Sequence, residues 1–247
     1  MDQQYTFHFL DHSLPIPHTD DFIESEINAD ALKWIEAWPD QFLSQNSVMH
    51  IAFPHAMMIC APEGCGKTHL ANQWAKRFNA TFLTCADIKA ILNNPPHTTH
   101  YYVVEDIHLI QDESLLFHFF NIIKDMESYV LFTSLHPPSL LPISLPDLRS
   151  RFNAIPVIRI PEPDDELLFH ITCKFFHERQ LKVEADVIHY MLCRINRSIR
   201  SVKDTVSKLD ASSLIERRAI TIPFVKDILS RENMSATTPQ ILWAPSN

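Results

Sequence analysis

The chain contains two glycines among its 247 residues, and both lie in one short loop, as Gly64 and Gly66. A chain of average composition carries about 7% glycine, so this sequence avoids the residue almost everywhere. Glycine tolerates a left-handed backbone and a close approach that a Cβ atom would obstruct. The loop Ala61 to Thr68 reads Ala-Pro-Glu-Gly-Cys-Gly-Lys-Thr. We therefore expect the chain's most demanding backbone conformation in this loop.

The segments on either side give the loop a structural context. The apolar run Met57 to Cys60 predicts a buried strand. Lys67 to Phe78 predicts a helix, because its large apolar residues recur every four positions. A phosphate-binding loop is recognised by this order of elements: a strand, a glycine loop that ends in Gly-Lys-Thr, and a helix. Its backbone amides and helix N-terminus face the phosphates of a nucleotide, the ammonium of Lys67 neutralises them, and the hydroxyl of Thr68 ligates Mg²⁺.

We predict that the nucleotide contacts Ala61, Pro62, Glu63, Gly64, Cys65, Gly66, Lys67, Thr68 and His69. Ala61 stands where the usual motif begins with glycine, a mild change because the phosphates approach the second half of the loop most closely. The alternative is a chance turn before an amphipathic helix.

A pair of acids follows a second apolar run, Tyr101 to Val104. In a phosphate-loop ATPase, acids at this position hold the Mg²⁺ shell and orient the attacking water. We assign Glu105 to the metal shell and Asp106 to the water, the reverse of the common Asp-Glu order. Exchanging the two lengths moves each carboxylate by about one methylene, which can slow catalysis by orders of magnitude. We therefore predict that the protein binds its nucleotide firmly and hydrolyses it slowly. The alternative is that the two acids simply form a strand end exposed to solvent.

Five apolar runs predict the strands of one sheet. Besides the two above they are Ala80 to Thr84, Tyr129 to Ser134 and Ala154 to Ile158, and a helix is expected over Ser114 to Lys124. Helices or long connections separate them, which predicts an α/β fold with a five-stranded, mostly parallel sheet flanked by helices. Ligands of such sheets bind at the carboxyl ends of the strands. Lys67, Glu105 and Thr133 lie at or just beyond those ends.

The segment His136 to Phe152 contains four prolines and is expected to be an extended loop. It leads to Arg149-Ser150-Arg151. An arginine here either stabilises the γ-phosphate of a nucleotide, its own or a neighbour's, or is a surface cation.

Beyond Pro163 the pattern becomes helical, which predicts a small helical domain. Its expected helices are Asp164 to Glu178, Ala185 to Arg194, Ser198 to Leu209 and Ile222 to Leu229. A basic stripe is formed by Arg194, Arg197, Arg200 and Lys203. Either one of these side chains reaches the nucleotide, or the stripe is simply a helix face exposed to solvent.

Composition excludes several classes of protein. No apolar run is long enough to span a membrane and the N-terminus does not read as a signal peptide, so we expect a cytoplasmic protein without membrane contact. Five scattered cysteines and fourteen histidines show no metal-ligand spacing. Residues 1–150 carry 7 Lys and Arg against 18 Asp and Glu, a net charge of −11. This argues against direct, specific DNA binding.

The ordered set of motifs resembles the AAA+ module of the bacterial replication initiator DnaA. The set comprises the phosphate loop, the acidic pair, Thr133-Ser134, Leu148-Arg149-Ser150-Arg151-Phe152 and Arg197-Ser198-Ile199-Arg200. The likeness is greatest to the DnaA-related Hda type of regulator, called HdaA in alphaproteobacteria. It extends from Phe22-Ile23-Glu24-Ser25-Glu26-Ile27-Asn28 to Arg218-Ala219-Ile220-Thr221-Ile222. It implies adenine as the base, with ADP favoured over ATP, although the residues themselves do not choose between the two.

The resemblance also implies roles for individual residues. Ile23 lies on the adenine side, Thr133 matches the sensor I residue, Arg200 matches the sensor II arginine, and Arg151 matches the arginine finger. It divides the chain into an N-terminal peptide (1–12), an AAA+ nucleotide-binding domain (13–160), a helical lid (161–232) and a tail (233–247). Because the sequence ends at Asn247, we expect no helix-turn-helix DNA-binding domain after the lid.

The N-terminal segment Gln4-Tyr5-Thr6-Phe7-His8-Phe9 looks like the QLxLxL-type peptide by which Hda docks on the sliding clamp of DNA polymerase. Gln4, Tyr5, Phe7 and Phe9 are the predicted clamp contacts, because alternate apolar side chains of an extended peptide can fill an apolar groove. A frayed terminus or an edge strand is the alternative.

The resemblance therefore implies a regulator that docks on the sliding clamp and presents Arg151 to the ATP of DnaA, so that initiation is switched off. Its own ATPase is expected to be weak, and its oligomeric state is left open. One competing hypothesis is a DNA-binding AAA+ initiator or helicase loader that uses the basic stripe on nucleic acid. The other is a phosphate-loop kinase of small molecules, which the helical C-terminal domain disfavours.

Overall fold

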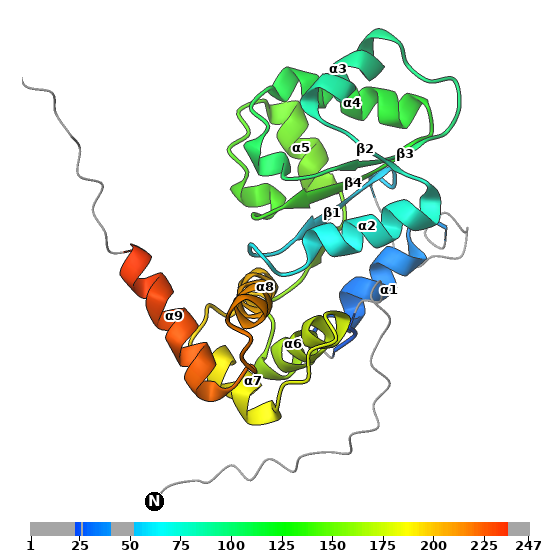
Figure 1. Cartoon of the computed structure of the whole chain (residues 1–247). Coiled ribbons are helices and arrows are strands. Elements are labelled where there is room, and N and C mark those ends of the chain that lie inside the picture. The colour runs from blue at the N-terminus through cyan, green and yellow to red at the C-terminus, as the bar shows by residue number, and fades with distance from the viewer. Residues whose placement is uncertain (1–22, 26, 41–51, 237–247) are drawn as a thin grey trace, which may run out of the picture.

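A computed structural model describes residues 23–25, 27–40 and 52–236 of the chain. The described part comprises a sheet covered by helices on both faces and a separate group of helices formed by the C-terminal third (Figure 1). The segment that carries Gln4, Tyr5, Phe7 and Phe9 lies outside these residues.

The five strands of the described residues form one parallel sheet. They are β1 (Ala56–Cys60), β2 (Thr81–Phe82), β3 (Tyr101–Val104), β4 (Tyr129–Ser134) and β5 (Val157–Arg159), in the order β2-β3-β4-β1-β5. All four pairings are parallel, which confirms the predicted fold class. Every residue of β1 and β4 is buried, so these central strands read as continuous apolar runs.

Helices cover the two faces of the sheet unequally. α1 (Ala29–Ala37) and α2 (Lys67–Phe78) lie on one face, and α3 (Cys85–Asn93), α4 (Glu113–Asp125) and α5 (Pro146–Ala154) lie on the other (Figure 1). Each face has its own apolar core. Trp38 stacks on Trp74 between α1 and α2, and the rings of Phe120, Phe132 and Phe152 pack together beneath α4 and α5.

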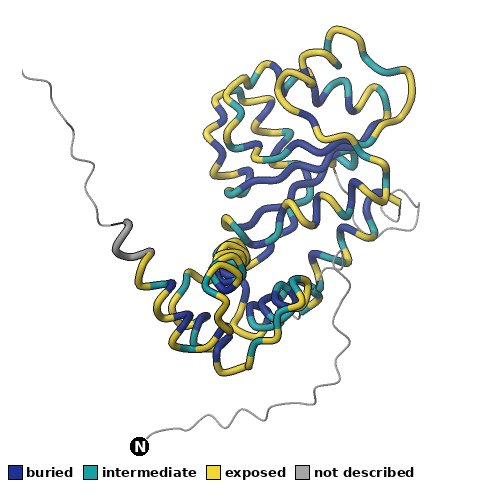
Figure 2. Tube along the Cα trace, viewed as in Figure 1, coloured by how far each residue is buried: buried dark blue, intermediate teal, exposed yellow. Residues whose placement is uncertain are grey.

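The C-terminal helices form the predicted lid. They are α6 (Asp165–Glu178), α7 (Ala185–Leu192), α8 (Ile199–Glu216) and α9 (Ile222–Ala236), and they enclose a third apolar core. Figure 2 shows that the buried residues are concentrated in the strands and on the sides of the lid helices that face one another. α8 and α9 continue beyond the expected ends at Leu209 and Leu229. In the extension of α8, Leu214 and Ile215 are exposed, so the buried apolar stripe that predicts a helix weakens there.

One prediction about this region is wrong. The proline-rich segment from His136 to Phe152 is not extended, because it contains the 3-10 helix η2 (Pro138–Leu140) and most of α5. Pro146 is the first residue of α5, where a helix needs no N–H donor and the fixed φ of proline is favourable. Because α5 continues to Ala154, the fifth strand is β5 and not Ala154 to Ile158. The predicted strand over Ala80 to Thr84 also shortens to β2.

Candidate nucleotide-binding site

The phosphate loop joins the carboxyl end of β1 to the start of α2. Gly64 has φ +74° and Gly66, which caps α2, has φ +91°. Both values lie in the left-handed region that residues with a Cβ atom rarely adopt. The regular helix α2 begins at the next residue, Lys67, and the free amides of its first turn point toward the loop. Both glycines therefore stand where the backbone takes a left-handed conformation, as the sequence predicted for this loop.

Lys67 folds back over this loop. It is the first residue of α2 and is 8% exposed, and its Nζ donates to the carbonyl oxygens of Ala61 at 2.8 Å and Pro62 at 3.0 Å. Burial lowers the pKa of Lys67, and the negative charge of Asp106 opposes the change most strongly. An ammonium held by two carbonyl oxygens beside a helix N-terminus is suited to a phosphate.

The start of α2 meets the acid that follows β3. The hydroxyl of Thr68 donates to Oε1 of Glu105 at 2.6 Å, across 37 positions of sequence. A hydroxyl and a carboxylate at this place are the protein ligands that Mg²⁺ takes beside a phosphate loop. The donor set therefore fits Mg²⁺ held between Thr68, Glu105 and nucleotide phosphates.

The second acid is held by its backbone. Asp106 has φ +49°, and its N–H donates to Oγ1 of Thr133 at 3.0 Å. Thr133 is buried near the end of β4, the strand beside β3, so the hydroxyl that matches sensor I fixes the turn on which Asp106 stands. The side chain of Asp106 is exposed, as a residue that orients a water molecule requires.

The lid contacts the phosphate loop directly. The N–H of Ile199, at the start of α8, donates to the carbonyl oxygen of Gly64 at 3.0 Å, and the guanidinium of Arg200 pairs with the carboxylate of Glu63. A Cβ atom on Gly64 would lie 2.9 Å from Cβ of Arg200 and 3.2 Å from Cβ of Ser198. Gly64 thus permits both the turn and the approach of the lid. Sequence reasoning missed Ser198 and Ile199, because a contact made by a backbone amide leaves little trace in side-chain identity.

The remaining loop residues divide by exposure. Pro62, Glu63, Thr68 and His69 are exposed, whereas Ala61 and Cys65 are buried. Burial raises the pKa of the Cys65 thiol, so it packs as a small apolar residue.

The described part of the adenine-side segment is organised by Asn28. Its side-chain amide donates to the carbonyl oxygen of Ile23 at 2.9 Å, and its Oδ1 accepts from the N–H of Ser25 at 2.8 Å. Asn28 is 2% exposed and precedes α1, which packs against α2. The half-buried Ile23 is therefore attached to the helix layer that carries Lys67.

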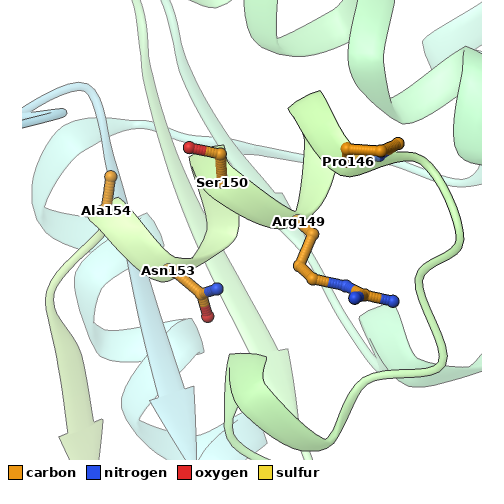
Figure 3. Close-up of a pocket in the computed structure, with 5 residues that line it drawn as sticks. All are labelled: Pro146, Arg149, Ser150, Asn153 and Ala154. Carbon is orange, nitrogen blue, oxygen red and sulfur yellow. The ribbon is translucent and has the colours of Figure 1, made fainter.

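Arg151 does not join this group of residues. It lies on α5, on the opposite face of the sheet from α2, and its guanidinium carbon is 4.4 Å from the centre of the Phe117 ring on α4. Its Nη1 is buried, with no hydrogen-bond partner among the described residues. Another part of α5 lines a shallow pocket, formed by Pro146, Arg149, Ser150, Asn153 and Ala154 (Figure 3).

Within residues 23–25, 27–40 and 52–236, no three His, Cys, Asp or Glu side chains gather as a metal site made of protein ligands alone. None of the helices in those ranges combines the length and the apolar character that crossing a bilayer requires.

Known proteins match the fold and the lid. Residues 174–229 match the sequence model of the family described as Hda, lid domain. Domain III of the replication initiation protein DnaA from Thermotoga maritima superposes with a TM-score of 0.68 at 16% identity, over 88% of this chain and 98% of that chain. AMPPCP-bound DnaA from Aquifex aeolicus superposes with a TM-score of 0.63 at 18% identity, over 87% of this chain and 69% of that chain.

The similarity extends to other AAA+ proteins. The RuvB Holliday junction branch migration motor of Thermotoga maritima gives a TM-score of 0.58 at 17% identity, over 72% of this chain and 61% of that chain. At these identities the superpositions establish the fold, and the family match establishes the type of lid. The chain therefore has the AAA+ fold that DnaA and RuvB share, with a lid that matches the Hda lid family over residues 174–229.

Proposed function

We propose that this protein is a cytoplasmic regulator of replication initiation that stimulates ATP hydrolysis by DnaA while docked on the sliding clamp. The Hda lid match carries the proposal, because it distinguishes this chain from the AAA+ motors and initiators that share its fold. DnaA is then the partner whose nucleotide is hydrolysed.

The position of Arg151 supports action on a partner. Its guanidinium lies on Phe117 of α4, and α4 and α5 cover the face of the sheet opposite α2, the helix that follows the chain's own phosphate loop. The Nη1 atom is buried and makes no hydrogen bond among the described residues, which is costly. The side chain would have to turn outward from Phe117 before a phosphate oxygen of a partner could accept from this atom. An arginine supplied to a neighbour's nucleotide stabilises the charge that develops during phosphoryl transfer.

The chain's own nucleotide, ADP or ATP with Mg²⁺, serves mainly to organise the lid. Lys67 and the loop amides hold its phosphates, and Thr68 and Glu105 hold the metal. DnaA relatives of the same fold have been solved with the ATP analogue AMPPCP. Asp106 is the residue that would orient water, and the reversed Glu-Asp order predicts slow turnover by the isolated protein.

A DnaA ATPase assay with the clamp loaded on DNA tests the proposal. The wild-type protein should accelerate hydrolysis, and Arg151→Ala should lose the acceleration by about 10³-fold, the lower end of the range for arginine fingers. Arg194→Ala is the matched control, because Arg194 also lies over an aromatic ring, that of Tyr190 in the lid. Full stimulation by Arg151→Ala would exclude the finger role.

The clamp contact is tested separately. Deleting residues 1–9 should abolish capture of the protein by the immobilised clamp while nucleotide binding is retained, since the phosphate loop is untouched. Gln4→Ala should weaken capture in the same direction. Undiminished capture after the deletion would show that another surface binds the clamp.

A further inference from the structure

Glu113, the first residue of α4, holds the loop that leads into α5. Its Oε1 accepts from the N–H of Ser144 at 2.7 Å and its Oε2 accepts from the N–H of Leu145 at 2.6 Å. These bonds, with that from Ser144 the largest cause, hold the pKa of Glu113 below its ordinary value. Both oxygens of one carboxylate thus bind two consecutive backbone amides of another element.

These bonds are not required to cap α4. Asp112 already caps that helix, because its carboxylate accepts from the N–H of Leu115 at 3.0 Å. The start of α5, by contrast, needs an outside partner: it follows Leu145, whose side chain has no polar atom, and it opens with Pro146, which has no N–H. Glu113 therefore fixes α5 and not its own helix.

The loop is also held from the side of α5. Nε of Arg149 donates to the carbonyl oxygen of Ile143 at 3.1 Å. The loop residues Ile143 to Leu145 are thus bound by a carboxylate from α4 and a guanidinium from α5. This double attachment sets where α5 begins.

α4 holds α5 a second time, one turn further on. Phe117 stands four positions after Glu113, so the two side chains share one face of α4. The ring of Phe117 carries the guanidinium of Arg151, at 4.4 Å. The same helix face therefore fixes the start of α5 through Glu113 and receives the arginine of α5 on Phe117.

We propose that Glu113 is a positioning residue for Arg151, setting the position of α5 and with it the point at which the guanidinium is presented to the partner's γ-phosphate. The inference rests on the proposed function, because it gives Arg151 its role. Glu113 touches neither nucleotide and acts only through Arg151.

The expected effect follows from the geometric demands of phosphoryl transfer. Displacing a catalytic group by about 1 Å can cost about 100-fold in rate. Glu113→Ala frees two amides at the start of α5, so we expect the kcat of stimulated DnaA hydrolysis to fall at least about tenfold, with little change in the concentration that gives half-maximal stimulation. Glu113→Gln keeps one acceptor oxygen and should give an intermediate loss.

A double-mutant cycle on DnaA ATPase stimulation tests this, using wild type, Glu113→Ala, Arg151→Ala and the double variant. Each protein is first checked for ADP binding and thermal melting, and Glu113→Gln replaces Glu113→Ala if the latter does not fold. The control is Asp87→Ala, because Asp87 likewise accepts from a backbone N–H, that of Thr84 at 2.8 Å, but fixes α3. It should stimulate as wild type does.

The inference holds if Glu113→Ala loses stimulation and adds no loss in the Arg151→Ala background. Three results would overturn it and leave the proposed function intact. Arg151→Ala could lose stimulation while Glu113→Ala does not, or the losses of the two variants could multiply in the double variant. The third is a loss of stimulation in Asp87→Ala as large as that in Glu113→Ala. Full stimulation by Arg151→Ala overturns the proposed function, and the inference falls with it.

Discussion

The carboxylate of Glu63 pairs with the guanidinium of Arg200, so an ion pair joins the phosphate loop to the first turn of α8. Beside it, the N–H of Ile199 donates to the carbonyl oxygen of Gly64. The lid is thereby attached to the loop through protein contacts alone. A nucleotide that draws Arg200 to its phosphates competes with Glu63 for the same cation.

Replacing Glu63 should strengthen nucleotide binding. Glu63→Gln removes a negative charge beside the phosphates and releases Arg200, and an exposed ion pair is worth about 0–1 kcal/mol, or up to about fivefold in affinity. We expect a gain of that size, larger for ATP than for ADP because the γ-phosphate adds charge. Titration with fluorescent ADP and ATP measures it, and Glu166→Gln, an exposed lid glutamate, is the control. Unchanged or weaker binding would mean that Glu63 does not compete for Arg200.

The Thr133 hydroxyl should stabilise the turn at Asp106. Thr133→Val keeps the volume but removes the acceptor of a partly buried hydrogen bond from the N–H of Asp106, which costs about 0.5–1.5 kcal/mol of unfolding free energy. Thr133→Ser keeps the hydroxyl and should lose less. Urea denaturation followed by circular dichroism compares them, and equal midpoints for the valine and serine variants would contradict this role.

Glu113 should make the stability of the protein depend on acid pH. Its pKa in the folded protein lies below the ordinary value of 4.5, so its contribution is present above pH 4.5 and is lost as the pH falls through the lowered folded pKa. The unfolding free energies of wild type and Glu113→Gln should therefore differ at pH 6 and converge as the pH falls well below 4.5. A difference that stays constant over this range would show that ionised Glu113 does not hold the loop.

The sequence predicted those parts of the fold that depend on side-chain pattern. The two glycines located the phosphate loop, and the predicted bounds of Lys67–Phe78 and Tyr129–Ser134 coincide with α2 and β4. Both elements are recognisable alone, since an apolar stripe at helical spacing or a continuous buried run requires no knowledge of the neighbours.

What the sequence did not predict depends on position or on backbone contacts. The prolines before Arg151 were interpreted as marks of an extended loop, but at the first position of a helix Pro146 favours α5. The attachment of Ile199 to Gly64 uses backbone atoms, which any residue possesses. The contacts of Glu113 with Ser144 and Leu145 span about thirty positions and follow no local period.

Calorimetric titration of the purified protein with Mg²⁺-ADP tests most directly whether the glycine loop holds a nucleotide. The account predicts saturable binding at one site by wild type, and a loss of about 10- to 100-fold in Lys67→Ala, since a charge-assisted hydrogen bond contributes about 1.5–3 kcal/mol. Lys76→Ala, near the other end of the same helix, should bind as wild type does. Equal ADP affinity in wild type and Lys67→Ala, or no binding by wild type, would contradict the account.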